Sequence, residues 1–90
     1  MRKWATRTEA IIKGAANSRR LMILKTLSRE PGLPLWKIAE NLHLNLKTVA
    51  GHTNRLLIAG LIAKRYEGRA VRHQLAPLGI KLLAFLERFK

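Results

Sequence analysis

The chain lacks cysteine and aspartate altogether, and its only acidic residues are five glutamates among 90 residues. Without cysteine it can form no disulfide bond, no thiolate metal site and no thiol redox switch, which fits a cytoplasmic protein. The sequence also offers no glycine-rich phosphate loop and no set of nucleophile, base and orienting acid. We therefore expect no catalytic residues and no enzymatic activity.

Long hydrophobic runs are absent too. No apolar stretch approaches the roughly 20 residues that span a bilayer, so no membrane segment is expected. The first ten residues are basic without an apolar core behind them, and they do not resemble a secretory signal. His43, His52 and His73 have no suitable carboxylates beside them. We therefore expect no metal site, no cofactor and no small-molecule effector.

Positive charge is abundant: 18 Lys and Arg residues against five acids give a formal net charge of +13 at pH 7. Hydrophobic residues still make up 48% of the chain, so it can bury a core rather than stay disordered. A folded, strongly basic module is typical of proteins that bind a polyanion. We favour nucleic acid, with a membrane surface or an acidic protein as alternatives. The length predicts one domain over residues 1–90.

Helical spacing of apolar residues dominates the first part of the chain. Residues 1–16 are expected to form an N-terminal arm or helix, helical from Thr6 onward. A second helix is expected over residues 19–28, with Asn17 or Ser18 as its cap. Its apolar face holds Ile23, Leu24 and Leu27. A Pro-Gly pair then ends it.

Residues 36–59 predict two helices joined by a tight turn. The first helix covers residues 36–42, and Leu44 is the expected buried plug in the turn. Asn45 caps the second helix and Gly60 ends it. At 100° per residue this second helix divides into an apolar half and a polar half free of acids. The apolar half consists of Leu46, Val49, Ala50, Thr53, Leu56 and Leu57.

The pattern becomes alternating over residues 61–75, which predicts a two-stranded hairpin, or wing, with its turn at residues 67–69. Residues 33–35 add a short strand at its edge, where a proline is tolerated. The expected fold is therefore mainly α with a small β-hairpin wing, in the order α-α-(short β)-α-α-β-β-α. This order is that of a winged helix-turn-helix.

Pro77 opens a last helix over residues 77–89 that is apolar beyond a single stripe. Its inner face is expected to hold Leu78, Leu82, Phe85, Leu86 and Phe89. Because a helix on the outside of a small domain needs only one buried face, the excess predicts contact with a symmetry mate. The expected dimer contacts are Ile11, Ile80, Leu83 and Leu86.

A gap in negative charge marks the surface where we place nucleic acid. No carboxylate occurs between Glu40 and Glu67, although Lys and Arg recur there. A surface that approaches phosphates cannot carry uncompensated negative charge. The candidates for reading base edges are Lys47, Thr48, His52, Asn54 and Arg55. The candidates for phosphates or the minor groove are Lys64, Arg65, Arg69 and Arg72 on the wing.

Some of these candidates have alternative roles. Residues alternate across a strand, so the four wing cations cannot all face one way. The basic face and hairpin can also be merely solvated. Arg20 either reaches a phosphate or pairs with Glu40. His52 contacts DNA or bonds within the helix-turn-helix, and His73 packs on its strand.

The linked pieces together resemble the winged helix-turn-helix domain of ArsR-like and, more distantly, MarR-like transcriptional regulators. The resemblance runs from about Asn17 to Phe89. It rests on the order and spacing of Asn17-Ser18-Arg19-Arg20-Leu21-Met22-Ile23-Leu24, Ile38-Ala39-Glu40 with Leu42 and Leu44, Thr48-Val49 with His52 and Leu56, Ala59-Gly60-Leu61-Ile62, Glu67-Gly68-Arg69 and Leu75-Ala76-Pro77-Leu78-Gly79.

The resemblance implies a regulator that binds specific double-stranded DNA as a homodimer on a palindromic site, with dimer contacts from the terminal helices. A repressor is the expected form. The chain departs from this family where metal sensors carry cysteines, or Asp and His on the last helix, so metal sensing is not expected. Ala76 replaces a common capping Thr, and Trp36 replaces a small polar residue.

Two other classes of function stay open. An architectural or RNA-binding winged helix with little sequence preference would suit the high net charge. A protein-interaction module would instead use the apolar last helix for a different partner. The salt dependence of DNA binding and the oligomeric state distinguish these classes.

Overall fold

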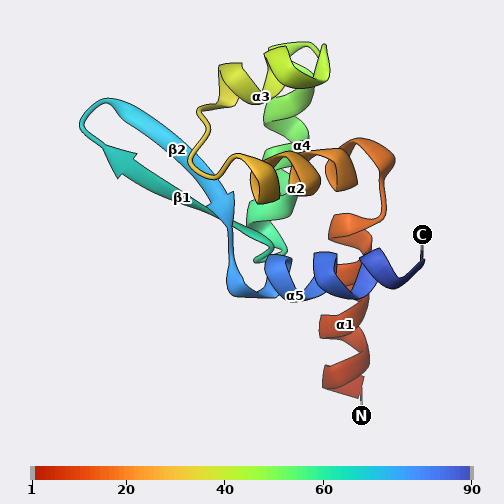
Figure 1. The fold of residues 1–90 in the computed structure, drawn as a ribbon. Coiled ribbons are helices and arrows are strands. Elements are labelled where there is room, and N and C mark those ends of the chain that lie inside the picture. Colours follow the sequence, from red (N-terminus) through yellow and green to blue (C-terminus); the bar gives the residue numbers. More distant parts are fainter. Residues whose placement is uncertain (1, 90) are drawn as a thin grey trace.

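The computed structural model describes residues 2–89 as five α-helices and a two-stranded antiparallel hairpin. The wing projects away from the helices, while α1 and α5 lie at the end of the molecule away from α3 (Figure 1). This order confirms the predicted winged helix-turn-helix. The elements are α1 (Arg2–Ala15), α2 (Ser18–Arg29), α3 (Leu35–Leu42), α4 (Leu46–Ile58), β1 (Ile62–Glu67), β2 (Ala70–Leu75) and α5 (Pro77–Leu86), followed by a 3₁₀ turn (Glu87–Phe89).

Asparagine side chains cap the starts of α2 and α4. The Asn17 side chain accepts hydrogen bonds from the backbone N–H groups of Arg19 and Arg20, and Asn45 does the same for Lys47 and Thr48. Both asparagines therefore satisfy donors that a helix start leaves free. The α1 helix was predicted too short: it begins at Arg2, since nothing in the first residues breaks a helix.

The hydrophobic core lies where α2, α3 and α4 meet the base of the wing. Its fully buried side chains are Ile23, Leu24, Leu27, Ile38, Val49, Leu56 and Leu61. Leu44 packs against this cluster as a partly buried residue, in the predicted turn. The prediction for Leu46 is wrong, because its side chain is 51% exposed. It stands in the first turn of α4 and lines the groove toward the wing, not the core.

The base of the wing is tied to the segment before α3. His73 N–H donates to the Leu33 carbonyl at 2.8 Å, and Gly32 N–H donates to the His73 carbonyl at 2.9 Å. The predicted strand over residues 33–35 is therefore a single bridge, because Leu35 already begins α3. Within the wing, Lys64 pairs with His73 and Arg65 pairs with Arg72 across the strands. At its tip, Gly68 has a positive φ of 60°, which glycine adopts without strain.

The last helix packs closely on the junction between α4 and β1. A Cβ added to buried Gly79 would lie 2.1 Å from the carbonyl oxygen of Leu61, so only glycine allows this approach. Phe85 and Phe89, predicted on the inner face, are 52% and 71% exposed, and their rings contact each other instead. Leu78 and Leu82 pack against the core as predicted, so the prediction is wrong only for the two phenylalanines near the C-terminal end of the helix.

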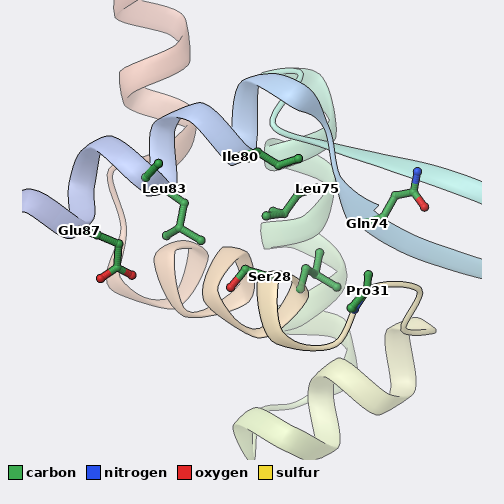
Figure 2. Close-up of a pocket in the computed structure, with 9 residues that line it drawn as sticks. Ser28, Pro31, Gln74, Leu75, Ile80, Leu83 and Glu87 are labelled. Atoms are coloured by element: carbon green, nitrogen blue, oxygen red, sulfur yellow. The ribbon is translucent and has the colours of Figure 1, made fainter.

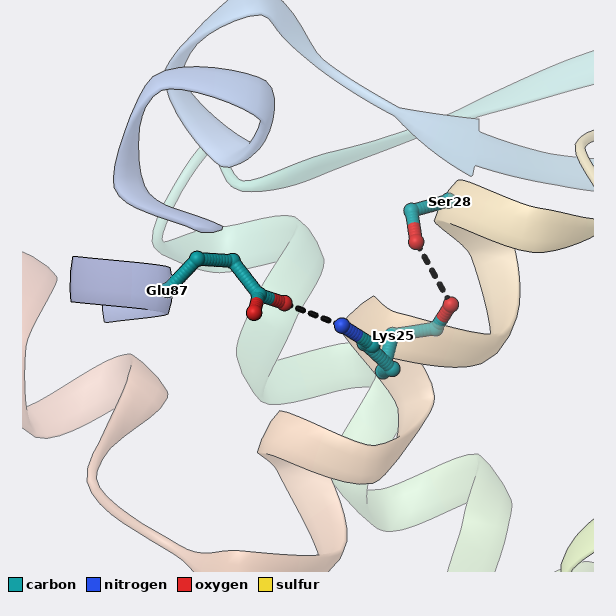
Figure 3. Close-up of polar contacts among 3 residues, drawn as sticks. All are labelled: Lys25, Ser28 and Glu87. Atoms are coloured by element: carbon teal, nitrogen blue, oxygen red, sulfur yellow. Dashed lines mark hydrogen bonds and ion pairs between the residues drawn. The ribbon is translucent and has the colours of Figure 1, made fainter. Parts of the chain in front are cut away.

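An ion pair holds the end of α5 against α2. The Lys25 ammonium contacts the Glu87 carboxylate, and the Ser28 hydroxyl donates to the Lys25 carbonyl at 2.7 Å (Figure 3).

Within residues 2–89 no helix has both the length and the apolar character needed to cross a bilayer.

Candidate nucleic-acid interface

The outward side of α4 is basic, polar and free of carboxylates. Lys47, Asn54 and Arg55 are exposed, and Thr48 is half-buried. Gly51 lies among them, with no atom within 4 Å of where a side chain would begin. The helix therefore presents long cationic and amide side chains around an open stretch of backbone. These are the side-chain types that reach base edges from a helix in a major groove.

His52 lies at the edge of this surface, half-buried, with its ring nitrogen Nδ1 next to Arg20. Arg20 donates from Nε to His52 Nδ1 at 3.2 Å, and from a terminal nitrogen to the carbonyl oxygens of Lys13 (3.2 Å) and Gly14 (3.1 Å). Arg20 thus joins the end of α1, the start of α2 and the middle of α4. Of the two predicted roles for Arg20, pairing with Glu40 is wrong, because Glu40 pairs with Lys37 at 3.1 Å.

The surroundings of His52 favour its neutral form. Burial, and then the positive charges of Arg20 and Arg19, lower the pKa of its imidazole. Because Nδ1 accepts the hydrogen bond from Arg20, the neutral ring carries its proton on Nε2. The ring can therefore donate from Nε2 to an acceptor outside the protein while Nδ1 stays engaged.

The four wing cations divide into two kinds. Arg65 and Arg72 both contact the Glu67 carboxylate, at 3.3 Å and 3.5 Å, and Arg72 also donates to the Gly32 carbonyl at 3.0 Å. These two cations brace the wing. The side chains of Lys64 and Arg69 have no hydrogen bond or ion pair with any residue between 2 and 89 and are exposed. The cations available to an external anion are thus Lys64 and Arg69.

The other histidines have structural positions. His73 is only 4% exposed, and its Nδ1 lies 3.0 Å from the Leu33 carbonyl oxygen. His43 closes α3 in the left-handed conformation, with φ of 53°. In the described part of the chain no three His or Glu residues gather as metal ligands would.

The predicted dimer residues fall in different surroundings. Ile11 packs against the protomer's own core, whereas its neighbour Ile12 is 57% exposed and was missed by sequence reasoning. Ile80 and Leu83 line a groove of about 570 Å³ between α5, the end of α2 and β2 (Figure 2). Ile80 is 56% exposed, while Leu83 and Leu86 are half-buried. The register of α1 turns Ile11 toward the core, since Gly14 packs against Ala59, the residue that follows α4.

Comparison with known proteins relates this geometry to a family. The sequence model of the MarR family matches residues 17–67, more than half of the chain. No curated protein matches the chain by sequence. Reduced HlyU from Vibrio cholerae is 28% identical and superposes with a TM-score of 0.83, over 99% of this chain and 94% of that one.

A second similar structure is the homodimeric winged helix-turn-helix DNA-binding domain of Mb0332 from Mycobacterium bovis, described as a possible ArsR-family transcriptional regulator. It is 26% identical, with a TM-score of 0.87, over 97% of this chain and 81% of that one. The predicted resemblance to ArsR-like and MarR-like regulators is confirmed. The chain belongs to the MarR family and is a DNA-binding transcriptional regulator of the winged-helix type.

Proposed function

We propose that the chain is a homodimeric repressor that binds a specific, palindromic site in double-stranded DNA. In this proposal α4 enters the major groove and the wing contacts the backbone or the adjacent minor groove. The observation that carries it is the acid-free outer side of α4, with Lys47, Asn54 and Arg55 exposed beside the two unpaired wing cations. A surface with this composition suits a groove lined by phosphates.

The side chains on α4 support direct reading of bases. The Arg55 guanidinium can donate two parallel hydrogen bonds to a guanine, and the Asn54 amide can pair with an adenine. The Nε2 proton of His52 can reach a base or a phosphate acceptor. Lys64 and Arg69 lie on the wing and not on the helix that enters the major groove, so we assign them to phosphates. Contacts to phosphates fix the orientation of the protein on DNA but do not read the base sequence.

A homodimer is favoured by apolar surface on the terminal helices. Trp4 and Ile12 on α1, and Ile80 and Phe85 on α5, are all more than half exposed. The similar Mb0332 domain is described as homodimeric. Two-fold symmetry would place two α4 helices about one helical turn of DNA apart, roughly 34–36 Å, on a palindromic site. Repression then follows from occupancy of a promoter.

An architectural role with little sequence preference is the second candidate, and the net charge of +13 favours it. Non-specific binding is nearly all electrostatic, so it weakens steeply with salt and is lost to competitor DNA. Sequence-specific binding keeps an advantage under the same conditions. Competition at near-physiological salt therefore separates the two.

The test is fluorescence anisotropy of the protein on labelled fragments from upstream of its own gene, with excess random DNA. We expect one fragment to retain a complex that the competitor does not remove. If random DNA abolishes binding to every fragment and leaves only a steep salt dependence, the architectural role replaces the proposal.

The two kinds of contact predict two different mutant phenotypes. Arg55→Ala should lose roughly 1–3 kcal/mol of discrimination at one base position in each half-site, because it removes a bidentate base contact. Arg69→Ala should weaken specific and random DNA alike and reduce the salt slope by about 1. Lys81→Ala, which removes one charge from an exposed site on α5, is the control. Equal losses for Arg55→Ala on specific and random DNA would exclude base reading by Arg55.

A further inference from the structure

A groove of about 840 Å³ lies between the start of α3 and the wing. Trp36, Lys37 and Leu46 line its helical side, and Lys64, Arg69 and Arg72 line its wing side. No carboxylate is among its lining residues. The groove therefore combines positive charge with apolar surface, and it is continuous with the α4 face at Leu46.

Trp36 is the least expected residue of this groove. Its side chain is 60% exposed, and that of Leu46 is 51% exposed. Lys37 lies 6.0 Å from the centre of the indole ring but is committed to Glu40. The indole is thus not packed on the core, and the one cation over its ring is already paired with Glu40. An exposed ring in a basic groove suits a partner that is anionic and also has apolar edges.

The sugar–phosphate strand of DNA has this combination. Its phosphates suit Lys64 and Arg69, whose side chains have no hydrogen-bond or ion-pair partner in residues 2–89. Its deoxyribose rings offer carbon surface to an indole face, and the indole N–H can donate to a phosphate oxygen. Lys64 also borders the narrower recess beside Gly51 and Asn54 of α4, so it stands between the helix and the groove.

We propose that this groove seats the strand that separates the major groove read by α4 from the minor groove at the wing, with Trp36 packed on a deoxyribose and Lys64 paired with a phosphate. The inference rests on the proposed function and adds a backbone contact that reads no bases. Trp36 acts as a positioning residue, because a strand held against it fixes the angle at which α4 enters the groove. If the groove instead binds an acidic peptide, DNA should leave the solvent accessibility of Trp36 unchanged.

Two consequences distinguish the indole from the cation. Trp36→Ala should lower affinity roughly tenfold on both specific and random DNA, because the lost contact is independent of sequence. Its salt slope should stay unchanged, since no charge is removed. Lys64→Ala should reduce the salt slope by about 1. Trp36→Phe keeps a ring and should retain most of the affinity.

Fluorescence reports the contact directly, because the chain has only two tryptophans. Trp4→Phe leaves Trp36 as the sole indole, and Trp36→Phe leaves Trp4 on α1 as the matched control. Acrylamide quenching is measured with and without a saturating DNA duplex, whose binding is followed independently by anisotropy of a label on the DNA. We expect DNA to reduce quenching of Trp36 several-fold and to leave quenching of Trp4 unchanged.

The outcomes separate this inference from the proposed function. If DNA binds while Trp36 stays equally accessible to acrylamide, the inference is overturned and the proposed function stands. Unchanged affinity of Trp36→Ala for both DNAs would overturn it in the same way. If no duplex binds, the proposed function fails and the inference fails with it. Protection of Trp36 together with the uniform loss in Trp36→Ala supports both.

Discussion

At the scale of single residues, the bond between Arg20 and His52 is the contact that most changes the interpretation of the α4 surface. Arg20 reaches two carbonyl oxygens at the end of α1 and one ring nitrogen on α4. One half-buried side chain therefore links a terminal helix to the helix that we propose reads DNA. This link needs a neutral imidazole, because a protonated Nδ1 cannot accept a hydrogen bond.

The pH dependence of stability tests this link. Because the pKa of His52 is lowered by folding, the unfolded chain binds its proton at higher pH than the folded chain. The stabilisation is present above about pH 6.5, the pKa in the unfolded chain, and is lost as the pH falls below it. His52→Gln removes the titration and keeps an oxygen acceptor for Arg20. Its urea midpoint should fall less than that of the wild type between about pH 7.5 and 5.5.

His43→Asn provides the matched control for this measurement. It removes an exposed histidine, and Asn tolerates the left-handed conformation found there. Its urea midpoint should keep the pH dependence of the wild type. A His52→Gln midpoint that falls as steeply as the wild-type one would show that His52 is not responsible.

At the scale of elements, two glycines show how differently one residue type can serve two helices. Gly79 lets α5 lie against the Leu61 carbonyl, at a distance that excludes any side chain. Gly51, in the middle of α4, has open space where a side chain would stand. The first glycine is required by packing. The second only weakens its helix, since glycine is a poor helix former.

Alanine at these two positions should have opposite effects on stability. Gly79→Ala should lower the free energy of unfolding by roughly 1–3 kcal/mol or more, because the methyl group meets backbone that cannot move aside cheaply. Gly51→Ala should raise it by roughly 0.5–1 kcal/mol. Urea unfolding followed by circular dichroism measures both. A neutral Gly79→Ala variant would contradict the close approach of α5 to Leu61.

At the scale of the whole molecule, the proposed DNA surface and the apolar surface of the terminal helices lie in different regions. The acid-free α4 face and the wing have unpaired cations. The α1 and α5 helices, which lie at the end away from α3 (Figure 1), expose large apolar side chains. Two copies that meet through the terminal helices would leave both α4 faces open to one duplex. In such a dimer the apolar contact would offset the repulsion between two copies that each have a net charge of +13.

Charged substitutions on the terminal helices test the proposed dimer. Ile12→Glu and Ile80→Glu should each raise the dimer dissociation constant at least about tenfold, because each would bury a carboxylate in the contact. Tyr66→Ser, on an exposed wing strand, should leave it unchanged. Sedimentation equilibrium measures all three. A wild-type chain that stays monomeric at high protein concentration would exclude the homodimer and favour a contact with a different protein.

The sequence alone determined the order of the elements and most of their ends. Four residues mark helix ends through backbone groups only a few residues away: Asn17, Asn45, Gly60 and Pro77. Their effect on the helix ends can therefore be inferred without tertiary structure. The charge gap is likewise a property of sequence order. The helical-wheel pattern of α4 correctly predicted which of its residues face the core, with one exception. Leu46 is exposed, because it borders the groove beside the wing.

Only the tertiary structure decided what the individual side chains do. Arg20 meets His52 across 32 residues, and Arg72 meets Gly32 across 40. No local pattern contains such distances, so sequence reasoning could not tell a bracing cation from one that is free for a ligand. The groove around Trp36 has the same origin, because it forms only where the wing folds back beside α3. Local capping and periodicity depend on neighbours in the chain, whereas the surface available to DNA depends on which distant segments meet.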